Sequence, residues 1–262
     1  MIPITYNINY AYGDVIKIKP LFDVHWGNTQ CDRPALKTYL VDSDELTFFF
    51  GGGDLFDSIV TPDKRYSKDT DDTETDTIID EQVETLYDVL LPYREKFIGL
   101  GIGNHERTVM KKCGTNPVAR MCSMLDTTYL GYSGFIRLKM SENGSRGRTV
   151  VIRWHHGWGG GRTPGASINR YSRELMSYEA DCYFYGHDHQ RKSDRIPRMG
   201  FVGKEIISKP QVIGVCGSYL KTFSLDNTVP YSEAAGYAPV EISGITLNIK
   251  PDRKWVKMWI NL

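Results

Sequence analysis

Residues 15–26 read VIKIKPLFDVHW, an apolar run that ends in two side chains of the metal-ligating type, Asp23 and His25. The run Val15–Phe22 has the length and composition of a buried strand. In an extended segment that leaves a strand, residues i and i+2 point to the same side, so Asp23 and His25 can face one spot. This stretch therefore predicts a strand with functional groups at its carboxyl end.

Similar apolar runs alternate with longer amphipathic stretches along the chain, which predicts an α/β fold. Further strands are expected at Leu46–Phe50, Lys96–Gly101, Thr149–Trp154, Asp181–Tyr185, Gln211–Val215, Gly244–Lys250 and Lys254–Ile260. Helices are expected at Thr77–Glu95 and Ile168–Glu179, and Pro251–Arg253 has the composition of a turn.

The chain has 262 residues, 40% of them hydrophobic, and 32 basic side chains balance 32 acidic ones. This composition excludes disordered, collagen-like and disulfide-scaffold proteins. We expect a single domain over residues 1–262, with an acidic insertion at about 61–76 and a strand-rich part at about 206–262.

No apolar run approaches the roughly 18 residues of a membrane span, and the first residues lack the basic and apolar pattern of a cleaved signal. The five cysteines are widely spread and form no CxxC pair, which favours reduced thiols: Cys31, Cys113, Cys122, Cys182 and Cys216. We therefore expect a cytoplasmic protein with no membrane contact.

The charges are unevenly distributed although their sum is zero. Residues 61–76 are rich in Asp and Glu and almost lack apolar side chains, so we expect an exposed, mobile loop. It is either a solvated insertion or a lid over a site. A base-rich stretch follows near residues 162–198, but zero net charge argues against a protein whose main task is to coat nucleic acid.

All six histidines of the chain fall in polar clusters that end apolar runs, and a fifth cluster carries aspartates. The clusters are Asp23–Gly27, Gly53–Asp57, Gly103–Glu106, His155–Gly157 and Gly186–His189. If five such loops meet at one sheet edge, they offer His nitrogen and Asp oxygen to borderline divalent metals.

The five clusters resemble, in order, the signature of the calcineurin-like metallophosphoesterase superfamily, DxH, GDxx[DE], GNH[DE], HG and GHxH. Residues 15–190 carry the resemblance, about two-thirds of the chain. The resemblance implies a four-layer α/β/β/α sandwich of two mixed sheets flanked by helices, with the metal site at the carboxyl ends of strands and the part at 206–262 completing the sandwich.

The same resemblance implies the metal ligands. Asp23, His25 and His189 would hold one ion, and Asn104, His156 and His187 would hold the other. Asp54 would bridge the two ions. His156 rather than His155 is expected as the ligand because it directly precedes glycine, which leaves His155 without an assigned role.

The implied reaction is phosphoester hydrolysis, in which a hydroxide shared by two divalent ions attacks phosphorus. His105 resembles the residue that stabilises or protonates the leaving oxygen, oriented by Asp57. Mn²⁺ is the first expected metal, with Fe, Zn²⁺, Ni²⁺ and Co²⁺ as alternatives. The expected substrate is a small phosphomonoester, phosphodiester or nucleotide.

Departures from single branches of the superfamily leave two alternatives open. Protein Ser/Thr phosphatases carry arginine where this chain has Ser58, so a phosphate-binding arginine is missing there. A DNA or RNA nuclease is the main alternative, with Arg162 and Trp158 as candidate substrate contacts. A non-catalytic, metal-binding interaction scaffold is the second. The oligomeric state is not predicted.

Overall fold

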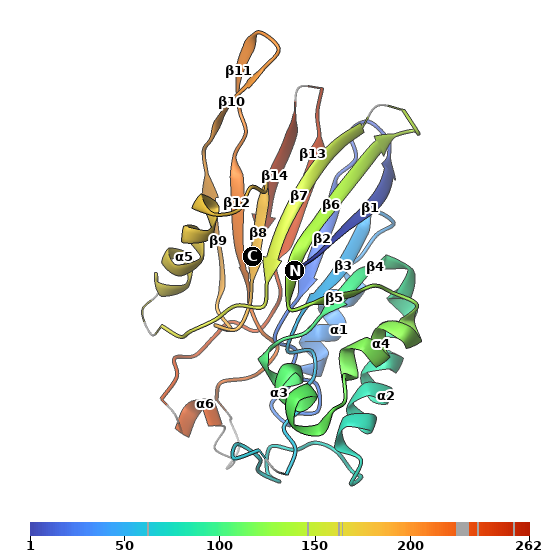
Figure 1. Cartoon of the computed structure of the whole chain (residues 1–262), viewed down its shortest axis with the longest axis vertical. Coiled ribbons are helices and arrows are strands. Elements are labelled where there is room, and N and C mark those ends of the chain that lie inside the picture. Colours follow the sequence, from blue (N-terminus) through green and yellow to red (C-terminus); the bar gives the residue numbers. More distant parts are fainter. Residues whose placement is uncertain are drawn as a thin grey trace.

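The computed structural model describes residues 1–61, 63–145, 147–161, 163, 165–223, 231–234, 236–253 and 255–262. Within this part of the chain, two mixed six-stranded sheets pack face to face (Figure 1). Sheet A has the order β1 (Ile2–Tyr10), β6 (Ser133–Glu142), β7 (Gly147–His155), β8 (Cys182–Tyr185), β12 (Gln211–Cys216), β9 (Arg191–Ile196). Sheet B has the order β14 (Val256–Asn261), β13 (Thr246–Pro251), β2 (Ile16–Leu21), β3 (Thr47–Gly52), β4 (Phe97–Gly101), β5 (Tyr129–Gly131).

Parallel strands form the centre of each sheet. In sheet B, β2, β3, β4 and β5 run parallel, and in sheet A, β7, β8 and β12 do so. Parallel strands place their carboxyl ends at one edge of a sheet, where ligands bind in α/β proteins. All the strands expected from the sequence are present, each within about two residues of its expected bounds.

The main core lies between the two sheets. Phe50 of β3 packs at ring-centroid distances of 6.3 Å from Trp154 of β7 and 6.0 Å from Phe184 of β8. All three side chains are buried, together with Ile16 and Ile18 of β2. These contacts hold the carboxyl ends of β3, β7 and β8 beside each other, which positions the loops that follow them.

Three helices cover the outer face of sheet B: α1 (Arg33–Val41), α2 (Ile78–Leu90) and α4 (Pro117–Leu125). Asp32 caps α1 and Asn116 caps α4, each through its side-chain oxygen, and a proline follows in the first turn. The expected helix Thr77–Glu95 is shorter, because a 3₁₀ segment, η1 (Leu91–Lys96), with proline in its first turn replaces the last part.

The layer outside sheet A is thin. The expected helix Ile168–Glu179 is instead two short pieces, α5 (Ala166–Tyr171) and the 3₁₀ segment η2 (Ser172–Met176). They cover β8 and β12 through Tyr171. The outer side of β6 instead exposes charged side chains such as Arg137 and Lys139. The four-layer α/β/β/α architecture is therefore present, with a small fourth layer.

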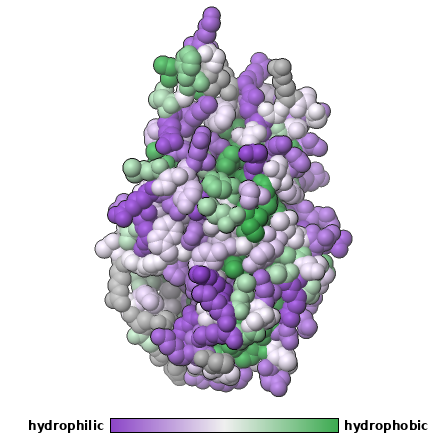
Figure 2. Space-filling view, in the orientation of Figure 1, coloured by the Kyte–Doolittle hydropathy of each residue, from purple (hydrophilic) through white to green (hydrophobic). Residues whose placement is uncertain are grey.

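Several elements lie where the sequence pattern predicts none. They are β1, β5, β6, β9, α1, α3 (Asn104–Cys113), α4, α6 (Tyr231–Ala234) and the hairpin of β10 (Met199–Val202) with β11 (Glu205–Ser208). The hairpin projects from the sheets, and apolar surface is visible near its end (Figures 1 and 2). Its Met199, Phe201 and Ile206 are exposed.

The described part of the chain contains no helix both long and apolar enough to span a bilayer. All five cysteines are free thiols, as expected from their spacing.

Candidate metal centre

The predicted metal ligands come together at the carboxyl edge of both sheets. Three groups of side chains could each hold a metal ion among the described residues: Asp23, His25 and His189; Asp54, His156 and His187; and His25, Asp57 and His105. In each group the ligand atoms lie within 4.8 Å of one another. The first group has the same members as one predicted ligand set. The second shares His156 and His187 with the other predicted set and contains Asp54 in place of Asn104.

In the first group, donor atoms from two loops face each other. The Nε2 atoms of His25 and His189 are 3.2 Å apart, and Nε2 of His189 is 3.6 Å from Oδ1 of Asp23. Asp23 Oδ1 is buried and has no hydrogen-bond partner among the described residues. Such an oxygen is costly to bury unless something else compensates its charge.

The amide oxygen of Asn104, which is also a predicted ligand, lies beside two members of the second group. It lies 2.9 Å from Nε2 of His156 and 2.8 Å from Nδ1 of His187. His156 Nε2 also lies 3.3 Å from Oδ2 of Asp54. The backbone N–H of His187 donates to Oδ2 of Asp23 at 2.7 Å, so the two groups are neighbours. The bridging role of Asp54 remains a prediction.

These spacings fit metal ligation. Ligands that each lie about 2.0–2.2 Å from a common ion are roughly 3 Å from one another, which matches the 2.8–3.3 Å separations within the second group and from it to Asn104. The set of imidazole, carboxylate and amide donors suits borderline divalent ions. The residues present therefore fit a metal centre.

Backbone strain is concentrated at the same residues. Of the eight non-glycine residues with positive φ in the described chain, five are predicted ligands: Asp23, His25, Asp54, His187 and His189, with φ between 49° and 71°. A side chain in this region costs about 1–3 kcal/mol unless the surroundings impose it. This strain lies at the residues where the backbone turns sharply out of a strand and directs a donor side chain into the site.

The electrostatics favour neutral imidazoles at most of these positions. Burial lowers the pKa of His25, His187 and His189, and only a neutral imidazole can ligate a metal. His156 differs: burial acts to lower its pKa, but the charge of Asp54 outweighs this effect and raises it to about 9. In the metal-free protein His156 and Asp54 therefore form an ion pair, which a bound cation would replace.

The two predicted catalytic residues lie beside the first group. His105 Nδ1 donates to the backbone carbonyl of Asp57 at 2.5 Å, and the His105 ring is 4.7 Å from that of His25. The Asp57 carboxylate is closer to Nδ1 of His25, at 3.3 Å, than to Nδ1 of His105, at 3.9 Å. Asp57 thus orients His105 mainly through its main chain, and its carboxylate supports His25.

Glu106 is a site residue that the sequence analysis did not single out. Its buried carboxylate accepts hydrogen bonds from the backbone N–H groups of Gly103 (2.7 Å), Asp54 (3.1 Å) and Phe56 (3.0 Å). It therefore joins the loop after β3 to the loop after β4. The acidic fourth position of the GNHE cluster was the available signal, but a contact across 50 residues has no local pattern.

The acidic segment 61–76 is exposed over about half of its described residues, as expected, but the rest of it packs against the protein. Its Asp63 and Thr73 are buried, and its backbone bonds to that of Gly27 and Thr29. Three of its six acidic side chains form ion pairs with other described residues: Asp63 contacts Arg65 and Lys112, Asp71 contacts Lys68, and Asp72 contacts Arg33. Residue Arg65 reaches the site, where its Nη1 lies 3.2 Å from Nε2 of His105.

The remaining predicted contacts surround the site without joining its donor groups. His155 accepts a hydrogen bond from the Gly157 N–H and lies edge-on to Trp158, at 5.0 Å. Trp158 also contacts Tyr171 and is 38% exposed. Residue Arg162 lies outside the described residues.

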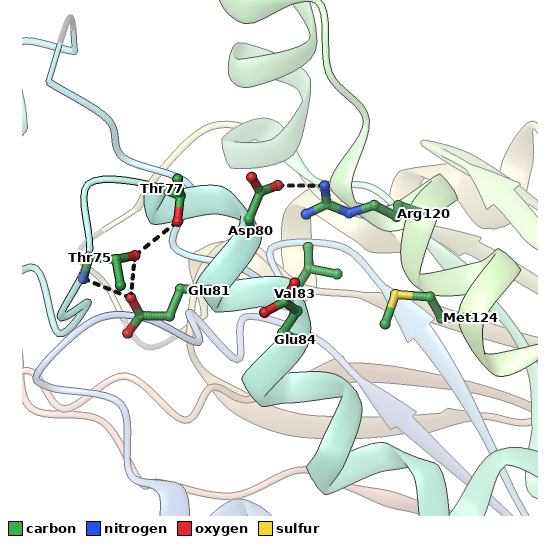
Figure 3. Close-up of a pocket in the computed structure, with 8 residues that line it drawn as sticks. All are labelled: Thr75, Thr77, Asp80, Glu81, Val83, Glu84, Arg120 and Met124. Carbon is green, nitrogen blue, oxygen red and sulfur yellow. Dashed lines mark hydrogen bonds and ion pairs between the residues drawn. The ribbon is translucent and has the colours of Figure 1, made fainter.

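A surface cavity of about 490 Å³ lies elsewhere, between α2 and α4 (Figure 3). Its wall includes Asp80, Glu81 and Arg120, and Arg120 forms an ion pair with Asp80 at 2.5 Å. Glu81 bonds to the backbone of Glu74 and Thr75 and so holds the end of the acidic segment. None of the predicted ligands lines this cavity.

Comparison with known proteins gives structural similarity only. No protein-family model and no curated protein matches the chain. Similar solved structures include a metallophosphoesterase from Sphaerobacter thermophilus (14% identity, 95% of this chain and 89% of that one, TM-score 0.44). Another is Vps29 from Entamoeba histolytica in complex with zinc (13%, 94% and 98%, 0.40). A third is the calcineurin-like phosphoesterase YfkN from Bacillus subtilis (12%, 94% and 90%, 0.35). The architecture and the convergence of the five clusters, as described above, agree with what the resemblance to calcineurin-like metallophosphoesterases implies.

Proposed function

We propose that this protein is a hydrolase of phosphomonoesters or phosphodiesters that depends on two divalent metal ions. The observation that supports it most is the meeting of two adjacent donor groups, built from five loops, beside a histidine that is not a predicted ligand. A structural metal site would need neither the second group nor His105.

Each donor group would hold one ion, with Asp54 beside both. When bound, such ions supply a hydroxide at neutral pH and neutralise charge on the phosphoryl oxygens. Asn104 contributes a neutral oxygen, so the ion on its side keeps more of its positive charge. Four of the seven predicted ligands are buried and the other three are half-buried, so one side of each donor group is open to substrate.

His105 would act on the leaving group. Since its Nδ1 donates to the Asp57 carbonyl, its Nε2 is the atom that can face substrate. To stabilise or protonate the departing oxygen, His105 would have to carry a proton at Nε2 in place of the hydrogen bond that this atom accepts from Nη1 of Arg65, at 3.2 Å. That role matters most when the leaving group is a poor one such as an alkoxide.

The test is hydrolysis of an aryl phosphate and a bis-aryl phosphodiester by protein loaded with Mn²⁺. Asp54→Asn and His105→Ala should each lower the rate by about two or more orders of magnitude. Asp14→Asn, in an exposed turn, is the control and should retain the wild-type rate. The proposal fails if monoesters, diesters, nucleotides and single-stranded DNA all survive under these conditions.

The proposed substrate is a small phosphoester or nucleotide, because the basic stretch offers less free charge than its composition suggests. Arg170 pairs with Asp188 at 2.7 Å and Arg191 pairs with Glu241 at 3.3 Å. Cleavage of oligonucleotides with a steep dependence of binding on salt would instead identify a nuclease.

A further inference from the structure

The acidic segment delivers one arginine to the candidate metal centre and holds it firmly. Asp63 accepts hydrogen bonds from Nε and Nη2 of Arg65, at 3.1 Å each, and from the Arg65 backbone N–H at 3.0 Å. A paired contact of this kind fixes the plane of a guanidinium group. The Arg65 side chain is 31% exposed and that of Asp63 is 7% exposed, so the pair lies at the edge of the site rather than in solvent.

The remaining nitrogen of this guanidinium faces the site. Among the described residues, the hydrogen-bond partner of Arg65 Nη1 is Nε2 of His105, at 3.2 Å. Arginine can only donate, and His105 already donates from Nδ1 to the Asp57 carbonyl, so Nε2 is the acceptor in this contact. A neutral imidazole nitrogen is a weak partner for a guanidinium when an anion is available.

Asp63 alone does not neutralise the cations beside it. The other carboxylates that act on Arg65 are Asp57 and Asp54 of the candidate metal centre, where bound cations would offset their charge. Two cationic side chains, Arg65 and Lys112, share the single carboxylate of Asp63, with Lys112 Nζ at 3.6 Å. The segment is anchored beside the first ligand loop, because the backbone of Asp72 donates to that of Gly27 at 3.0 Å. Arg65 is therefore presented on a supported loop and need not be ordered by the substrate.

We propose that Arg65 binds a terminal oxygen of the substrate's phosphoryl group through Nη1 and that it makes phosphomonoesters the preferred substrate class. This inference rests on the proposed hydrolase function and supplies the phosphate-binding arginine that is missing at Ser58. A monoester has three terminal oxygens and a diester has two, and at neutral pH a monoester carries more negative charge. A fixed guanidinium therefore favours the monoester.

The first experiment compares Arg65→Ala with the wild type on an aryl phosphate and a bis-aryl phosphodiester. Loss of a charge-assisted hydrogen bond should lower kcat/KM for the monoester by about tenfold to a hundredfold. The loss for the diester should be smaller. Arg65→Lys keeps the positive charge but lacks the planar set of guanidinium N–H donors, so it should lose less of kcat/KM than Arg65→Ala does. Lys68→Ala removes a positive charge from the same loop at a 68% exposed side chain and should leave both rates unchanged.

The second experiment measures binding of inorganic phosphate to the metal-loaded protein by calorimetry, which does not depend on turnover. The Kd should rise by about tenfold or more in Arg65→Ala, with metal content and the circular dichroism spectrum unchanged. Asp63→Asn, which frees the guanidinium, should weaken binding less than Arg65→Ala does.

The outcomes separate this inference from the proposed function. If the wild type cleaves esters while Arg65→Ala keeps its phosphate affinity and its ratio of monoester to diester rates, the role of Arg65 is wrong and the hydrolase stands. If phosphate binds through Arg65 but no ester is cleaved, the anion site stands and the hydrolase is wrong. If the wild type neither binds phosphate nor cleaves an ester, both are wrong.

Discussion

The carboxylate of Glu106 accepts hydrogen bonds from three backbone N–H groups, two in the loop after β3 and one in the loop after β4. Burial, and next the nearby charge of Asp54, raise the pKa of Glu106. The residue thus sits in an unfavourable electrostatic position, and its hydrogen bonds compensate. At this scale the site depends on a side chain that is not one of the predicted ligands and that bonds to three backbone N–H groups.

Glu106→Gln should therefore destabilise the protein by about 2–4 kcal/mol, because the amide puts an N–H group where a backbone N–H needs an acceptor. The free energy of unfolding, measured by urea denaturation, provides the test. Glu95→Gln, at an 85% exposed side chain, is the control and should change little. An unchanged stability for Glu106→Gln would show that the three hydrogen bonds do not hold the loops.

At the scale of elements, the site requires two loops to approach each other closely. A Cβ on Gly53 would lie 2.4 Å from the backbone nitrogen of Gly103, and Gly53 has a φ of +104°. The loop after β3 can therefore pack against the loop after β4 only if residue 53 is glycine. Helix α2 supports the same region, since Gln82 accepts a hydrogen bond from the Ser58 N–H at 3.1 Å.

Gly53→Ala should displace Asp54, lower the bound metal content and destabilise the fold by more than the roughly 1–3 kcal/mol of backbone strain alone. Gly144→Ala is the matched control: its φ is +76°, but nothing lies within 4 Å of the added Cβ. Elemental analysis and thermal unfolding of both variants would check this. Equal effects of the two substitutions would contradict a role for the close approach.

At the scale of the whole molecule, stability depends on the core between the sheets, which also fixes how the ligand loops of β3, β7 and β8 meet. Trp154 is fully buried there and packs against Phe50. Since no helix among the described residues lies between the sheets, their side chains set the separation of the sheets. A substitution that destabilises this core should therefore also displace the loops that carry the predicted ligands.

Trp154→Ala should cost about 3–5 kcal/mol through the cavity that it leaves. Trp259→Ala, at a 38% exposed position on β14, should cost much less. The test compares the unfolding midpoints of the two variants, and that of Trp154→Ala should be much the lower. Comparable losses would mean that the Trp154 cavity closes by rearrangement of the sheets.

The pH dependence of the metal-free protein follows from its buried histidines. Burial lowers the pKa of His25, His187 and His189 in the folded state, so the unfolded chain takes up protons first as the pH falls through about 6.5. The free energy of unfolding should therefore be lower at pH 5.5 than at pH 7.5. Burial also lowers the pKa of His155, to about 3, which adds a fourth group to this effect. His156, with a pKa of about 9, acts in the opposite sense, as do Asp23 and Glu106, whose pKa values burial raises, so the expected change is the balance of the four histidines with lowered pKa values against these groups.

Urea denaturation in the presence of a chelator would measure this dependence. His189→Asn should flatten it, because one of the four groups that resist protonation is removed. Stability that is equal or greater at pH 5.5 would contradict the assignment of these side chains as buried and neutral.

Local patterns were enough for several features. Apolar runs predicted the central strands, because strand formation follows from nearby residues. Which side chains should face one another was implied by the resemblance that the order of the five clusters carries, because the parallel strands pair across about 30 residues and leave no local signal. The exposed edge strand β1 and the hairpin of β10 and β11 escaped prediction, since their polar and apolar residues do not mark them as core.

The sequence by itself determined which donor side chains are available and in what order, and the resemblance carried by that order implied the chemistry that we propose for them. Only the tertiary structure decided that Glu106 joins two loops, that Asp57 supports His25 as well as His105, and that a segment expected to be exposed brings Arg65 to the site. These contacts join residues far apart in the chain, and their energies depend on burial and distance, which no local pattern encodes.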